Sequence, residues 1–143
     1  YGVAAAVGGK LAAPQRPVIA VVGDGGFSMA GMEVSTAVTE NVPVVWVVLN
    51  DARLNAVHHG QTLQYAGRTI GTEFRRMDVA GIAVALGAWA RRVTRPGDIG
   101  PAVAAALASG RAAVIDVRID ADEVPPIHSR VRSLDKLFVG ENA

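Results

Sequence analysis

Two acidic residues, each placed where a predicted strand ends, are the side chains of this sequence best suited to chemistry. Asp24 lies in the stretch Gly23-Asp24-Gly25-Gly26-Phe27, after a β-branched run, and Asp51 follows the apolar run that ends at Leu49. Glycines at such a turn let a phosphate approach the backbone, and the helix start that follows offers free N–H groups. A carboxylate among those N–H groups would repel a phosphate unless a cation such as Mg2+ lay between them. The alternative is a tight strand-to-helix turn whose glycines serve sterics alone.

These residues can meet only if a sheet brings both strand ends to one edge. Short apolar runs bounded by Gly, Pro or Asn predict strands at residues 18–22, 44–49, 88–93 and 113–119. Helices are predicted at residues 2–13 and 29–40, from Asp78 to Gly87, and from Asp98 to Gly110. This alternation predicts an α/β fold, a parallel sheet with helices on both faces and right-handed crossovers. Such a crossover would return Asp51 to the same edge of the sheet as Asp24.

Composition narrows the classes of protein. The chain has 143 residues, 50% of them hydrophobic and 19% charged, which fits one folded domain and excludes disorder. The net charge is +1 and both signs are mixed along the chain, so the sequence has no basic patch of the kind that binds nucleic acid. No apolar run is long enough to span a membrane. The absence of cysteine excludes disulfides and fits a cytoplasmic setting. Because the chain begins at Tyr1, inside a predicted helix, we expect a fragment of a longer enzyme, with residues 120–143 as its C-terminal tail.

The block from Gly23-Asp24-Gly25 to Asn50-Asp51 resembles the thiamine-diphosphate (ThDP) binding motif, which begins Gly-Asp-Gly and ends near Asn-Asn. The Ala-rich stretch from Tyr1 to Ala12 and the step Val124-Pro125-Pro126 are similar to the corresponding parts of acetolactate synthase-like enzymes. The resemblance covers nearly the whole chain. It implies that residues 1–143 are the C-terminal, diphosphate-binding domain of such an enzyme, with a three-layer α/β/α fold.

The resemblance also implies roles for individual residues. Mg2+ would be held by the side chains of Asp24 and Asp51 and by the backbone carbonyl of Arg53. Gly25, Gly26 and Phe27 would offer backbone amides to the diphosphate, and the remaining cofactor-binding positions would be Gly23 and Asn55. Three residues depart from the pattern: Asp51 stands where the family usually has Asn, Gly26 where Ser is commoner, and Asn55 where many relatives have Gly. No catalytic residue is assigned.

The implied activity is that of a decarboxylating carboligase acting on a 2-oxo acid such as pyruvate. A simple 2-oxo acid decarboxylase and a non-catalytic domain of the same fold remain alternatives. The glutamate that activates the cofactor would lie in a pyrimidine-binding domain of the same enzyme, reached across a homodimer or homotetramer interface, so the isolated chain is expected to be inactive. Use of FAD cannot be read from this sequence.

Three further hypotheses were weighed. A nicotinamide-binding domain is disfavoured because Ser28 occupies the third-glycine position of its fingerprint and Asp24 would face the pyrophosphate without a metal. His58 and His59 could contribute a catalytic group, although packing or surface exposure is the default. The arginines of the aperiodic segment 60–77 could bind a substrate carboxylate, although a solvated loop is favoured; they are Arg68, Arg75 and Arg76.

Overall fold

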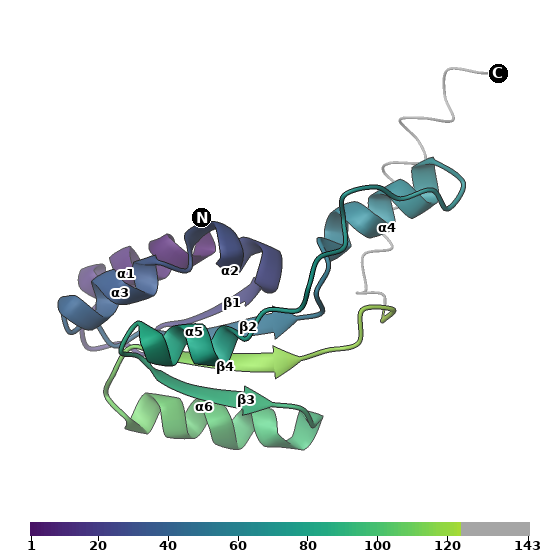
Figure 1. Cartoon of the computed structure of the whole chain (residues 1–143). Coiled ribbons are helices and arrows are strands. Elements are labelled where there is room, and N and C mark those ends of the chain that lie inside the picture. Colours follow the sequence, from purple (N-terminus) through teal and green to yellow (C-terminus); the bar gives the residue numbers. More distant parts are fainter. Residues whose placement is uncertain (124–143) are drawn as a thin grey trace.

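A parallel four-stranded sheet forms the centre of the protein, whose computed structural model describes residues 1–123. The strands lie in the order β1-β2-β4-β3 (Figure 1), with the bounds β1 (Ile19–Gly23), β2 (Val45–Asn50), β3 (Trp89–Val93) and β4 (Ala113–Arg118). All three neighbouring pairs are parallel. Each strand begins and ends within one residue of its predicted bounds, and the predicted parallel sheet is confirmed.

Helices cover both faces of this sheet and make three layers, as predicted. On one side lie α1 (Gly2–Ala12), α2 (Asp24–Ala30), α3 (Glu33–Thr39) and α5 (Val79–Ala85); on the other lie the short 3-10 helix η1 (Pro96–Asp98) and α6 (Ile99–Ala108). A further helix, α4 (Asn55–Gln64), projects away from the body (Figure 1). No helix of residues 1–123 is long and apolar enough to cross a membrane.

The central strand β2 explains why its sequence is apolar throughout. Trp46 and Val48 face the core on the α1 side, whereas Val45 and Val47 face the core beneath α6. A strand covered on both faces has no solvent side and therefore no polar alternation.

The edge strand β1 is covered on one face only. Ile19 and Val21 are 45% and 64% exposed, and they stand in register with Val45 and Val47 on the α6 side of the sheet. α6 packs mainly on the other three strands. An apolar strip therefore remains exposed along this face of β1.

The prediction of one helix over residues 29–40 was wrong. The structure has two short helices there, and α2 already begins at Asp24, so the glycines that follow lie in its first turn instead of in a loop. The chain bends at Gly31, where an added Cβ would lie 2.7 Å from the carbonyl oxygen of Phe27. Starting the helix directly at the strand end brings these amides to the sheet edge.

The predicted start of α5 and the predicted ends of α5 and α6 are confirmed. The Asp78 side chain accepts a hydrogen bond from the Gly81 amide and caps α5, as predicted, and Gly87 and Gly110 follow α5 and α6 with positive φ. The predicted tail beyond residue 123, including Val124-Pro125-Pro126, lies outside the described residues. The assignment of residues 1–143 to one domain stays a prediction.

Trp46 links α1 to the sheet, because its Nε1 donates a hydrogen bond of 3.1 Å to the carbonyl of Val3 and its side chain is fully buried. We expect Trp46→Phe to lower the free energy of unfolding by about 1–3 kcal/mol, since the Val3 carbonyl loses its partner and the smaller ring leaves a gap. Denaturant unfolding followed by circular dichroism measures this. Trp89→Phe, on the edge strand and only half-buried, is the control; an equal loss there would contradict the prediction.

Candidate functional site

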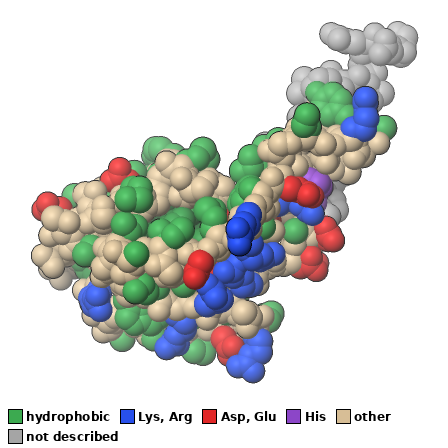
Figure 2. Space-filling view, viewed as in Figure 1, with side chains coloured by type: hydrophobic (Ala, Val, Ile, Leu, Met, Phe, Trp, Pro, Cys, Tyr) green, Lys and Arg blue, Asp and Glu red, His purple; other side chains and the backbone are tan. Residues whose placement is uncertain are grey.

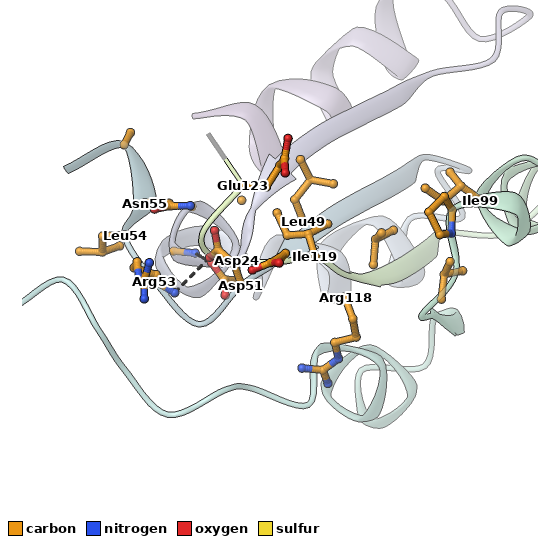
Figure 3. A pocket seen from close by; sticks show the side chains of 18 of the residues that line it. Asp24, Leu49, Asp51, Arg53, Leu54, Asn55, Ile99, Arg118, Ile119 and Glu123 are labelled. Carbon is orange, nitrogen blue, oxygen red and sulfur yellow. Dashed lines mark hydrogen bonds between the residues drawn. The ribbon is translucent and has the colours of Figure 1, made fainter. Parts of the chain in front are cut away.

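The ends of β1 and β2 place the two predicted acidic residues together. Asp24 directly follows β1 and Asp51 directly follows β2, and Gly23 pairs in register with Leu49 at the C-terminal edge of the sheet. Both carboxylates line one cavity of about 670 Å³. Figure 3 shows them side by side at one end of this cavity, with Leu49 next to them and Ile99 at the other end. The predicted meeting of the two acids is confirmed.

Most of the predicted cofactor-binding residues reach the same cavity. Its walls include Gly23, Asp24, Gly25, Gly26, Asp51, Arg53 and Asn55. Phe27 is the exception, because it is 2% exposed and its ring packs in the core. Only its backbone amide, in the first turn of α2, could serve a ligand.

Asp24 is a buried acid held by backbone amides. Its Oδ2 accepts a hydrogen bond of 2.7 Å from the Ala52 amide, and its Oδ1 accepts one of 2.8 Å from the Gly25 amide. Burial raises the pKa of this carboxyl above the ordinary aspartate value; the Ala52 amide opposes the rise, and the negative charge of Asp51 adds to it. A cation between the two carboxylates would relieve this penalty on the charged form.

The turn after β2 is fixed by a segment that the sequence did not reveal. Residues 72–76, here called the strap, run antiparallel to the turn: the Leu54 amide donates to the Thr72 carbonyl at 2.7 Å, and the Phe74 amide donates to the Ala52 carbonyl at 3.1 Å. The strap helps to hold Ala52 in the left-handed region, with φ of 65°, where its amide can reach Asp24. No periodicity could have signalled this pairing.

Arg76 closes the strap on the end of β2. Its guanidinium donates to the backbone carbonyls of Asn50 at 2.7 Å and of Asp51 at 3.4 Å. The guanidinium that was considered for a substrate carboxylate is thus directed at the backbone of the turn. By contrast, the carbonyl of Arg53 accepts no hydrogen bond from any residue between 1 and 123.

A second buried carboxylate network braces the same sheet edge. Asp116 of β4 is fully buried, accepts a hydrogen bond of 2.8 Å from the Asn50 side chain, and pairs with Arg92 and Arg118 at 3.1 Å each. Asn50, the first residue of the Asn-Asp step, therefore ties β2 to β4. This role was not predicted from the sequence, although a charged residue inside the apolar run of β4 indicates a buried polar network.

The chain leaving β4 crosses back to the turn. The Arg53 side chain pairs with Glu73 at 3.2 Å and with Asp122 at 3.1 Å, and the Asn55 side chain donates to the Ala121 carbonyl at 3.0 Å. Asp120 and Glu123 consequently join the wall of the cavity. These two side chains were not predicted from the sequence.

The histidines lie beside the site rather than in it. The Nδ1 atom of His58 lies 3.0 Å from the hydroxyl of Thr72, and the ring of His59 meets that of His58 edge to face. Neither ring is among the residues that line the cavity. A packing role, the default at the outset, is what their contacts support.

Within residues 1–123, no cluster of three or more His, Cys, Asp or Glu side chains could hold a metal ion by itself. Two carboxylates facing one cavity suit an ion that completes its shell with other oxygen ligands, such as phosphate, water or a backbone carbonyl. The arrangement is suited to a metal-bridged anion.

Comparison with known proteins identifies this arrangement. Residues 1–117 match the family described as "Thiamine pyrophosphate enzyme, C-terminal TPP binding domain". The chain belongs to this family. Thiamine pyrophosphate is ThDP, so the predicted ThDP-binding family and fold are confirmed, whereas Mg2+ stays a prediction.

Relatives within the family carry different activities in their names. The chain is 36% identical to the acetolactate synthase large subunit of Corynebacterium glutamicum, over 85% of this chain and 20% of that one. It is 33% identical to the sulfoacetaldehyde acetyltransferase of Alcaligenes xylosoxydans xylosoxydans, over 95% of this chain and 24% of that one. A solved structure, the ThDP-dependent 4-hydroxybenzoylformate decarboxylase of Rhodococcus jostii RHA1, matches with a TM-score of 0.80 and 31% identity, over 86% of this chain and 23% of that one. The chain thus spans only about a fifth to a quarter of the length of these relatives.

The strap yields a test of the turn's construction. We expect Arg76→Ala to speed hydrogen exchange at the Ala52 and Leu54 amides by about three- to tenfold, because the turn loses hydrogen bonds that hold its carbonyls. Hydrogen-exchange mass spectrometry of the turn peptide measures this. Arg75→Ala, an exposed neighbour for which no side-chain hydrogen bond is seen within residues 1–123, is the matched control. Equal exchange rates in the two variants would show that the Arg76 side chain does not hold the turn.

Proposed function

We propose that this domain binds ThDP through Mg2+ in an enzyme that decarboxylates a 2-oxo acid, such as pyruvate, and joins the remaining acyl unit to a second carbonyl compound. Asp24, Asp51 and the Arg53 carbonyl would hold the ion. The amides of Gly26 and Phe27 would bind the diphosphate, and Gly25, whose amide donates to Asp24, would let the diphosphate approach the backbone. The observation that carries the proposal is the pair of buried carboxylates facing one cavity in a chain of this family.

The residues present suit this group. Both carboxylates are buried, at 1% and 7% exposure for Asp24 and Asp51, and a buried acid normally requires a cation nearby. In the turn that follows β2, the carbonyls of residues 50–52 already accept hydrogen bonds, whereas that of Arg53 accepts none from the described residues. The amides at the start of α2 have no carbonyl partner within the helix. Gly23 and Asn55 would contribute to the wall around the diphosphate.

ThDP, when bound, supplies the carbanion chemistry by which 2-oxo acids lose CO2, and this chain's residues supply orientation and charge. The identity to acetolactate synthase supports carbon–carbon bond formation as the outcome. The match to a benzoylformate decarboxylase supports simple decarboxylation as the second candidate. Product analysis with pyruvate separates them, because a carboligase forms acetolactate and a simple decarboxylase releases acetaldehyde.

Calorimetric titration of the native protein with ThDP tests the proposal. We expect binding with Mg2+ present, a loss of at least about 100-fold in affinity when Mg2+ is removed or in Asp24→Asn, and no binding of NAD. Glu40→Gln removes one charge from an exposed residue that ends α3, outside the cavity, and should bind as the wild type does. ThDP affinity that ignores Mg2+ would refute the metal-bridged site.

The partner would be the pyrimidine-binding domain of the same enzyme, across a homodimer or homotetramer interface. α4 and the following residues 65–71, here called the α4 arm, support a partner at this side. No side chain of α4 is buried, and every residue from 62 to 71 is exposed. Hydrophobic side chains lie near its far end (Figure 2), among them Leu63, Tyr65 and Ile70. A ten-residue helix without a fully buried residue is marginal in water, so contact with another domain would stabilise it.

The need for that partner makes a second prediction. We expect purified residues 1–143 to show no turnover of pyruvate with ThDP and Mg2+, because the glutamate expected to activate the cofactor would lie in the other domain. CO2 release from labelled pyruvate measures this. The complete native protein, assayed in parallel, shows whether the conditions support the reaction. Turnover by the isolated chain would contradict the prediction.

A further inference from the structure

The two acids of the cavity are buried without any ion pair inside the described structure. The salt bridges of residues 1–123 involve neither Asp24 nor Asp51. Arg76, the arginine that fixes their turn, directs its guanidinium to backbone carbonyls. Amides stabilise the two carboxylates but carry no net charge. Two negative charges are thus left without a direct ion-pair partner in residues 1–123.

The arginines that line the cavity do not serve this purpose. Arg53 pairs with Glu73 and Asp122, Arg95 with Asp98, and Arg118 with Asp116. Each is therefore already neutralised by another acid, and no lysine is among the lining residues.

Asp116 provides an internal comparison. It is as deeply buried as Asp24, yet two arginines and one amide side chain surround it. The same sheet edge therefore pairs one buried carboxylate directly with two guanidinium groups and gives the two carboxylates at the cavity no direct ion pair within residues 1–123. This contrast indicates that the pair is built for an external cation.

We infer that Asp24 and Asp51 together bind one divalent cation in the absence of ThDP, so that the ion can enter first and the diphosphate is recruited to it. The inference rests on the proposed function and deepens it. Each carboxylate oxygen of Asp24 accepts one amide hydrogen bond and keeps further acceptor capacity for a cation. A second full negative charge, which an amide at position 51 would lack, strengthens attraction for the free ion. Water would fill the remaining ligand positions until phosphate oxygens replace it.

The test uses Mn2+ as the probe and the native protein freed of metal and cofactor. Electron paramagnetic resonance counts free Mn2+ during a titration without ThDP. We expect one ion per chain, with affinity weakened about tenfold or more in Asp51→Asn and in Asp24→Asn, because ligand charge tunes the affinity of oxygen sites. Asn at position 51 keeps the oxygen that accepts the Arg53 amide at 3.1 Å, so the turn should stay in place. Glu40→Gln is the charge-matched control.

The outcomes separate the inference from the function beneath it. If the wild type binds ThDP with Mn2+ but shows no Mn2+ binding alone, or if Asp51→Asn binds Mn2+ as tightly as the wild type, the cation-first inference is overturned and the proposed function stands. If no divalent ion promotes ThDP binding, the proposed function itself fails. Thermal unfolding of each apo variant checks that weaker Mn2+ binding does not result from unfolding of the protein. The wild-type titration tests the inference without any variant.

Discussion

The adjacency of β1 and β2 is the constraint on which the site depends. Asp24 and Asp51 each follow a strand by sequence, but only parallel pairing in this register brings both to one edge. Slipping the register by one residue would turn the side chains of β2 to opposite faces and bury the wrong set against α1 and α6. The apolar cores on the two faces therefore fix the position of the acids, although neither core contacts a ligand. The packing of these two cores therefore holds the carboxylates of Asp24 and Asp51 close together although they repel each other.

Three structural features of different stability form the wall at the sheet edge. The Asp116 network ties β2 to β4 with fully buried groups, and the strap fixes the turn with backbone pairing and Arg76. The α4 arm has no buried side chain on its helix and contacts the strap through His58 and Thr72. The ligand-binding wall is thus rigid where it meets the sheet and weakly supported where it extends from it. Local stability should fall in the same order, which is the distribution expected of a surface completed by another domain.

Sequence reasoning recovered the fold and the acid pair because both are written in local patterns. Apolar runs with flanking glycines gave the strands, and the position of Asp24 and Asp51 directly after two such runs gave the site. It failed where position depends on distant backbone. The strap has no period, and the role of Arg76 arises only when residue 76 returns beside residue 50. The two-helix break at Gly31 was missed because the close packing that favours glycine there, against the Phe27 carbonyl, is visible only with coordinates. Asp116 is different: a charge inside an apolar strand was a readable signal.

The arginines that line the cavity are already paired with acids, and this limits their attraction for a bound anion. A diphosphate beside Asp24 and Asp51 adds negative charge to a wall whose guanidinium groups already face other acids. Backbone amides contribute partial charges only, and the first turn of a short helix adds little more. In the proposed site, attraction for the anion would therefore come mainly through a cation held by the acids. A carboxylate at position 51 would hold that cation more strongly than an amide and would tolerate the anion less without it, so the two ligands would be coupled more tightly than at a site with a single acid.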